Sequence, residues 1–289
     1  MLRRIKNIAL LFIVIFSLFT LFQENKNTKI NAQQLSTNLT FEVSTSPVEY
    51  VLREPIQFNL RLSNNTVSPV NAGTRLSLRD TNFLVIGENG DTTRWEINKY
   101  ISDGSPSGII EIPPNKNLET ENLLNGSLAE KIFSHSGQYR LKLEYVYENY
   151  IPERETIRSV SNLLTITISE PQGVNKRAYD YLKDVFESAR QKGESLQELR
   201  QFFVDNFNTS VYAKYIIVDL AIMYRGTEDA KAERELCKIV NINFFYSKQV
   251  KNNLSEIANK LRPVRLISNL PENVPRPAFS KPCVNLPTN

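Results

Sequence analysis

Short runs of alternating hydrophobic and polar residues fill the first part of the chain. One run extends from Ile56 to Leu62 and a longer one from Tyr139 to Tyr147. A period of two predicts half-buried antiparallel strands, because successive side chains of a strand point to opposite faces. We expect about seven or eight such strands between residues 36 and 170. Further runs lie at Phe41–Val43, Leu76–Leu78, Trp95–Ile97 and Ile166–Ile168.

Turn-forming residues separate these runs. Glycine, proline, asparagine and aspartate favour tight turns because they adopt or preset the backbone angles that turns need. Many short strands divided by such turns predict a β-sandwich of two packed sheets. The turn signals are Asn64-Asn65, Gly87–Asp91, Asp103-Gly104, Pro113-Pro114 and Asn125-Gly126.

A helical period replaces the alternation after about residue 174. The first helix carries Ala178, Leu182 and Ala189 on one face and should end at Gly193. Ser195 and Glu198 have the spacing of a capping box for the next helix. A third helix, Val211–Tyr224, is apolar on most faces and should be central. We expect two further helices at about 228–242 and 248–261.

The fold class is therefore a β domain followed by an α domain. We expect a signal peptide at 1–32, a β-sandwich at 33–171, a helical-hairpin domain at 172–261 and a proline-rich tail at 262–289. The tail holds six of the 14 prolines and should be extended.

Four segments resemble known bacterial modules, among them Ser161–Pro171, which resembles the final strand of bacterial immunoglobulin-like domains. Pro55–Asn64 is similar to the early strand of bacterial immunoglobulin-like domains, and Ser136–Tyr145 is similar to a late strand that a Gly-x-Tyr opens. Asn208–Tyr215 resembles the start of a helix in tetratricopeptide-like repeats, with Asn208 where that pattern often has proline. The chain thus resembles bacterial exported proteins with an immunoglobulin-like sandwich followed by a tetratricopeptide-like region. The resemblance implies a fold and no particular activity.

The first 32 residues are typical of a secretory signal. Basic residues precede an uncharged apolar run at 8–22, and Ala32 before Gln33 supplies a small residue for cleavage. We expect export to the periplasm, the cell surface or the exterior. The segment between the run and Ala32 is long, which leaves an inner-membrane anchor at residues 8–22 as the alternative, although about 20 apolar residues are usual for a spanning helix.

Charge narrows the classes of partner. The whole chain has a net charge of +4, but residues 33–289 carry 30 basic and 30 acidic residues. Nucleic-acid binding needs a basic footprint, so a nucleic-acid partner is not expected. Membrane contact is expected only through an uncleaved leader. The charge is uneven, at −5 over residues 33–170 and +5 over 171–289.

Cys237 and Cys283 are the only cysteines. Export permits a disulfide between them, which would pin the tail to a helix. The other reading is two separate buried or free thiols. Two cysteines and one histidine cannot supply a four-ligand zinc site. The sequence also has no phosphate loop, dinucleotide fingerprint or EF-hand spacing, so we expect no metal and no cofactor.

No catalytic constellation stands out. His135 is the only histidine, so a Ser-His-acid triad would have to include it, and its place in a turn favours a surface residue. Glu111 and Glu144 could pair for glycoside hydrolysis, but both fall on predicted outward strand positions. We therefore expect a protein that is not an enzyme.

The expected function is binding of another protein or an envelope component. A face around Phe202, Tyr212, Tyr215 and Tyr224 is the candidate binding surface, because exposed aromatic side chains anchor interfaces. The alternatives are a carbohydrate-binding module with a flat row of exposed Tyr and Trp, or a protease-inhibitor or chaperone-like sandwich that offers an edge strand. A hydrolase is the remaining alternative and has the least support.

Overall fold

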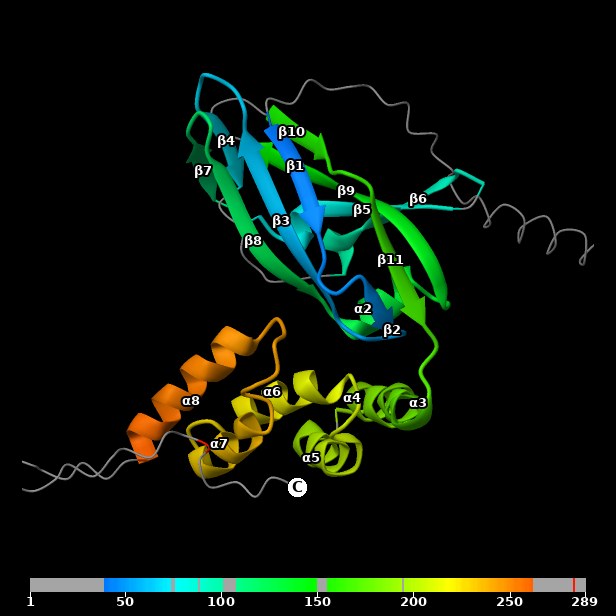
Figure 1. Cartoon of the computed structure of the whole chain (residues 1–289), viewed down its shortest axis with the longest axis vertical. Coiled ribbons are helices and arrows are strands. Elements are labelled where there is room, and N and C mark those ends of the chain that lie inside the picture. Colours follow the sequence, from blue (N-terminus) through cyan, green and yellow to red (C-terminus); the bar gives the residue numbers. More distant parts are fainter. Residues whose placement is uncertain are drawn as a thin grey trace, which may run out of the picture. The chain divides into compact units, whose positions relative to one another are not determined.

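A computed structural model describes residues 39–73, 76–87, 89–100, 108–149, 155–193 and 195–261, together with Cys283. The predicted leader, its cleavage site at Ala32–Gln33 and the tail apart from Cys283 lie outside these residues. Within them, a β-sheet region precedes a helical region along the chain (Figure 1). None of the helices described is both long and apolar enough to cross a membrane.

The strands form three sheets, mostly from antiparallel pairs. One sheet has the order β1-β3-β8, a larger one has the order β2-β11-β9-β5-β6 with β10 paired to β9, and β4 pairs with β7. The β2–β11 pair is parallel. The strands are β1 (Leu39–Ser44), β2 (Glu49–Val51), β3 (Ile56–Asn64), β4 (Val70–Gly73), β5 (Thr81–Ile86), β6 (Thr92–Glu96), β7 (Ile109–Ile112), β8 (Asn117–Leu124), β9 (Gly137–Asn149), β10 (Glu155–Val160) and β11 (Leu164–Ser169).

Alternation correctly predicts the strands with one buried face. In β1 and β3 every apolar residue of the pattern is buried while the polar residues between them are half-buried or exposed. The long run at Tyr139–Tyr147 is β9, and Ile166 and Ile168 are buried in β11. The period of two records burial directly, because each of these strands packs only one of its faces.

The expected strand at Leu76–Leu78 is wrong. Leu76 and Leu78 are buried, but Leu78 opens a short 3₁₀ turn, Leu78–Asp80. The Asp80 amide donates to the Ser77 carbonyl at 3.0 Å, and the Thr81 hydroxyl donates to the Leu78 carbonyl at 2.8 Å. These local bonds turn the backbone, so the two leucines reach the core from a bend. The following strand β5 is buried on both faces over Thr81–Leu84, so alternation misses it.

The described chain divides into two compact units. Among the described residues, the first unit contains those up to Glu42, those within Leu62–Leu118 and those within Arg140–Leu164, and the second contains those within Val43–Arg61, those within Glu119–Tyr139 and those from Thr165 onward. In the first unit, β9 pairs with β5 and with β10, and β5 pairs with β6. Its core holds Tyr145, whose hydroxyl accepts a hydrogen bond from the Gly73 amide at 3.0 Å. Burial raises the pKa of this phenol.

The second unit contains the helices. Helix α2 (Gly126–Ile132) begins at Asn125, whose side chain accepts from the Leu128 amide. A continuous helical stretch follows β11 as α3 (Gly173–Asp180), a π-helical segment (Tyr181–Phe186) and α4 (Glu187–Gln191). The remaining helices are α5 (Leu196–Phe207), α6 (Ala213–Tyr224), α7 (Asp229–Cys237) and α8 (Ser247–Leu261). Successive helices from α5 to α8 contact one another.

Two helix details differ from the sequence-based expectation. Ser195 is the N-cap of α5, but its side chain makes no capping hydrogen bond, so the expected capping box with Glu198 is absent. Helix α7 ends at Cys237 and the expected helix to 242 is shortened. Residues 239–243 read Ile-Val-Asn-Ile-Asn, and β-branched residues and asparagine are poor helix formers. The Ile242 amide instead donates to the Ile239 carbonyl in a turn.

Candidate binding surfaces

A partly buried ion network surrounds the loop between β2 and β3. Arg53 lies in this loop with a left-handed φ of 67°, and its side chain is only 10% exposed. Its guanidinium contacts Glu130 of α2 at 2.8 Å and Glu187 of α4 at 2.5 Å. The Tyr179 hydroxyl donates to Glu130 at 2.5 Å. Burial, with the Glu130 carboxylate second, raises the pKa of Tyr179 to about 12. This loop therefore joins α2, α3 and α4.

The same loop holds the start of α6. The Tyr212 hydroxyl donates to the Leu52 carbonyl at 2.7 Å, and Lys214 Nζ contacts Glu54 Oε1 at 3.2 Å. Burial raises the pKa of Glu54, and the Lys214 ammonium lowers it in part. The Tyr215 hydroxyl lies 3.4 Å from the Pro55 carbonyl. Tyr212 therefore connects the start of α6 to this loop inside the second unit.

Three of the four aromatics expected at a binding face pack inside the second unit. Tyr212 and Tyr224 are 2% and 3% exposed, so neither belongs to a surface. The Tyr224 hydroxyl donates to Gln201 Oε1 at 2.8 Å. Tyr215 is half-buried and contacts the rings of Phe244 and Tyr246 edge-on. The expected four-residue face is therefore corrected, because helix α6 is central and turns its tyrosines toward neighbouring segments.

Phe202 is the one predicted residue that remains at the surface. It is 49% exposed, and its ring stacks on Tyr181 with centroids 5.2 Å apart and planes 21° from parallel. Phe207 contacts both rings. The Tyr181 hydroxyl donates to the Leu199 carbonyl at 3.2 Å, which fixes its ring. We call Tyr181, Phe202 and Phe207 the aromatic surface. Sequence periodicity could not have found Tyr181, because it lies in the unexpected π segment.

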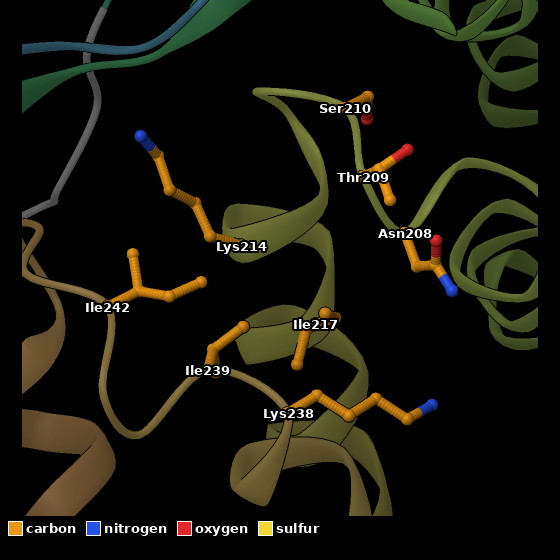
Figure 2. A pocket seen from close by; sticks show the side chains of 8 residues that line it. All are labelled: Asn208, Thr209, Ser210, Lys214, Ile217, Lys238, Ile239 and Ile242. Atoms are coloured by element: carbon orange, nitrogen blue, oxygen red, sulfur yellow. The ribbon is translucent and has the colours of Figure 1, made fainter. Parts of the chain in front are cut away.

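A pocket of about 390 Å³ lies between the start of α6 and the turn after α7 (Figure 2). The ammonium groups of Lys214 and Lys238 point away from one another in this view. Each is paired with a carboxylate, Lys214 with Glu54 and Lys238 with Glu235. The buried Ser210 hydroxyl has no hydrogen-bond partner among the described residues. The lining residues are Asn208, Thr209, Ser210, Lys214, Ile217, Lys238, Ile239 and Ile242. Because both ammonium groups are already paired, the lining residues do not indicate which ligand the pocket would bind.

The structure joins Cys237 and Cys283 in a disulfide. Their Cα atoms are 5.4 Å apart and their sequence separation is 46 residues. Cys237 is the last residue of α7, so the bond ties a position in the tail to the end of that helix.

We expect both thiols of the native protein to resist alkylation until a reductant is added. The physical reason is that a disulfide sulfur is not a thiolate and cannot attack the reagent. Intact mass spectrometry after iodoacetamide treatment, with and without prior reduction, measures this. Alkylation of both cysteines without reductant would contradict it, and the same spectrum reads whether the mature chain begins at Gln33.

The candidate catalytic residues do not form a shared site. His135 is exposed, and its Nδ1 lies 2.8 Å from the Ser134 hydroxyl. No carboxylate contacts this imidazole among the described residues. Glu111 is exposed on β7, while Glu144 is buried in β9. Within the described residues, no three His, Cys, Asp or Glu side chains are placed to hold a metal ion.

Glu144 is the centre of a second ion network, in the first unit. Its carboxylate accepts a hydrogen bond from the side-chain amide of Asn82 at 3.0 Å and contacts Arg94 at 2.7 Å and Arg158 at 3.8 Å. Its side chain is 9% exposed although it points to the outer side of the sheet. The arginines cover it, so its outward position and its burial are compatible.

The aromatic pair Trp95 and Tyr100 does not form a flat platform. Trp95 is half-buried, Tyr100 is exposed, and their rings are 6.4 Å apart and inclined by 46°. Stacking on sugar rings is favoured by exposed aromatic faces in one plane, which this pair does not offer.

Comparisons with known proteins find only distant structural similarity. No family model and no curated protein matches the chain. The CARDB domain of a Pyrococcus furiosus protein, solved with di-metal ions, matches 45% of this chain and 91% of its own at 13% identity and a TM-score of 0.23. The C-terminal domain of Wzt matches 47% of this chain and 76% of its own length, at 10% identity and a TM-score of 0.30. A β-glucosidase from Listeria innocua matches 43% of this chain and 16% of its own length, at 9% identity and a TM-score of 0.23. Scores this low carry no inference about function.

Proposed function

We propose that this chain is an exported, non-enzymatic binding protein that acts through protein–protein contacts in the cell envelope or outside the cell. The aromatic surface is the observation that carries this proposal. Phe202 is half exposed, yet stacking on Tyr181 holds its ring in one place. A large apolar ring that is already ordered loses little conformational entropy on binding, so it contributes strongly at an interface.

An aliphatic neighbour on the π segment supports the same face. Val185 is 42% exposed and follows Tyr181 by four positions within Tyr181–Phe186. Residues four or five apart share one side of a π-helical turn, and such segments are frequent at functional sites. The partner surface that fits is apolar, for example one face of an amphipathic helix.

The finer fold assignment is part of the proposal. We propose an immunoglobulin-like arrangement for the β-sheet region and tetratricopeptide-like hairpins for the helical region. The burial pattern of β3 and β9 and the chain of contacts from α5 to α8 support it. The leader at 1–32 supports export to the periplasm, the cell surface or the exterior, with an inner-membrane anchor at residues 8–22 as the alternative.

A photo-crosslinking amino acid at position 202 tests the proposal in the source cell. We expect one envelope protein to be joined reproducibly at position 202, and none at position 222 of α6. Ile222 is the matched control because it is an apolar helix residue with 48% exposure, against 49% for Phe202.

Binding between the purified chain and its crosslinked partner then gives the size of the effect on affinity. Phe202→Ser should weaken binding about tenfold or more, which corresponds to about 1.4 kcal/mol, while Ile222→Ser should leave the affinity close to that of the native chain. Isothermal calorimetry measures both, with circular dichroism confirming the fold of each variant. Equal losses of affinity for the two variants, or crosslinking of the same protein at both positions, would contradict the proposal.

A further inference from the structure

The exposed side of α5 carries two carboxylates next to Phe202. Glu198 lies four positions before Phe202 and Asp205 lies three positions after it, and all three side chains are exposed. Residues at these spacings are neighbours on one side of a helix, with Cβ atoms about 5 to 6 Å apart. We call Glu198 and Asp205 the acidic rim of the aromatic surface.

The acidic rim and Tyr181 border Phe202 from opposite sides. At about 100° per residue, the two carboxylates of the rim lie about 40° and 60° to one side of Phe202 around the helix axis. Phe203 and Phe207 lie about 100° and 140° to the other side, and both contact the ring of Tyr181. A partner that covers Phe202 therefore meets an aromatic ring on one side and carboxylates on the other.

No cation among the described residues neutralises the acidic rim. Arg200 is the only cation of α5, and it lies on the opposite side of the helix, 3.6 Å from Asp219 and over the ring of Phe186. Asp205 accepts a hydrogen bond from the side-chain amide of Gln201 at 2.9 Å, which leaves its charge in place. The rim is therefore a local negative charge in a half of the chain whose overall charge is +5.

Helix stability does not account for both members of the rim. Asp205 lies in the last turn of α5, which holds no basic residue. The C-terminal end of a helix has a partial negative charge, so a carboxylate there is unfavourable. Glu198 lies in the first turn, where the same effect is favourable. What the two carboxylates share is their place beside Phe202.

The charge of the rim distinguishes between possible occupants of the aromatic surface. An anionic lipid surface would bring its phosphates close to the carboxylates and would be repelled. A protein segment that carries lysine or arginine beside apolar side chains can pair with the rim while it covers Phe202. An amphipathic helix presents charged and apolar side chains on adjacent parts of one surface, so it suits this arrangement.

We propose that the aromatic surface and its acidic rim bind a basic amphipathic helix of a partner protein. This inference rests on the proposed protein-binding function and names the chemistry of the partner. Apolar side chains of the helix cover Phe202 and Val185, and its lysine or arginine side chains pair with Glu198 and Asp205.

A fluorescein-labelled model peptide tests this inference with the purified native chain. The peptide consists of two copies of the heptad Leu-Lys-Lys-Leu-Leu-Lys-Leu, which places lysines beside a leucine face when it is helical. We expect saturable binding by fluorescence anisotropy, and binding about tenfold weaker or less for a peptide with glutamate in place of every lysine. The double variant Glu198→Gln/Asp205→Asn should lose about tenfold or more in affinity for the lysine peptide.

Glu49→Gln/Glu121→Gln is the matched control for this double variant. It makes the same change in net charge at exposed positions of β2 and β8 in the same unit, so the affinity should change little. Circular dichroism confirms the fold of each variant. Absence of binding, equal affinity for the two peptides, or equal losses in the two double variants would overturn the inference. Binding to phosphatidylglycerol vesicles that is lost in Phe202→Ser would also overturn it, because the surface would then take lipid.

Asp205→Asn alone separates a binding role from a structural one. Asparagine keeps an oxygen that can accept the hydrogen bond from Gln201, and it removes a charge that the last turn disfavours. We expect the urea midpoint to stay unchanged or rise, while the affinity for the lysine peptide falls about threefold or more. A fall of the urea midpoint together with the affinity would assign Asp205 a structural role and contradict the inference.

These outcomes are separate from those of the proposed function. A partner crosslinked at position 202 that binds less well to Phe202→Ser but equally well to Glu198→Gln/Asp205→Asn would leave the protein-binding function standing and remove this inference alone.

Discussion

Replacing Arg53 with methionine is expected to lower the free energy of unfolding by about 3 kcal/mol. Methionine replaces the aliphatic stem of the arginine but leaves Glu130 and Glu187 without their shared cation. Their side chains are 19% and 29% exposed, so hydration of the two carboxylates compensates for only part of the lost interaction. The estimate is the lower end of the range for breaking a buried pair, because Glu187 is the more exposed partner.

Urea unfolding followed by circular dichroism measures this change, because the helices that Arg53 joins dominate the signal. Arg61→Met is the matched control: Arg61 contacts Glu119 at 3.4 Å with side-chain exposures of 52% and 61%. An exposed pair contributes about 0 to 1 kcal/mol, so this variant should be close to the native chain. Similar losses in the two variants would show that the network around Arg53 has no special role.

Gly126→Ala is expected to destabilise the protein by about 3 kcal/mol, from overpacking. A Cβ at position 126 would lie 2.1 Å from the Arg53 carbonyl oxygen, far inside van der Waals contact. The obstacle is backbone, held in place by the β2–β3 loop and its ion pairs, so it cannot swing aside like a flexible side chain.

The sign of the change makes this a sharp test. Gly126 is the first residue of α2, and alanine in an isolated helix is favoured over glycine by about 1 kcal/mol. Without the close approach, the substitution would therefore stabilise α2. Ser127→Ala, one position along the same helix, is the control: it removes only an exposed hydrogen bond from the Ser127 hydroxyl to the Asn125 side chain and should have a much smaller effect. A rise in the urea midpoint for Gly126→Ala would show that the two segments do not touch in solution.

The β-strand positions were predictable where one face is buried. The alternation from Ile56 to Leu62 records which side chains leave water, and that pattern is local in sequence. Strand β5 was missed because it is buried on both faces over Thr81–Leu84, where alternation vanishes. The loop network was beyond sequence reasoning, because Arg53 is 77 residues from Glu130 and 134 from Glu187.

The candidate site was predictable only in part. Phe202 and Tyr212 are both aromatic residues in a helical region, and composition cannot tell which faces water. The apolar character of Val211–Tyr224 did indicate a central helix, and that signal argued for the burial of Tyr212 and Tyr224. The burial of Glu144 was also not predictable. Its outward position on the strand predicts exposure, but Arg94 and Arg158 from other strands cover it.

The bond between Cys237 and Cys283 turns part of this linear chain into a covalent ring. Helix α8 and all the residues between the two cysteines belong to that ring. A protease that cuts once between Lys238 and Pro282 opens the ring but releases no fragment. The nicked protein keeps its mass, apart from one added water, until a reductant separates the two pieces. Loss of the segment that contains α8 therefore requires either two cuts or one cut and a reducing compartment.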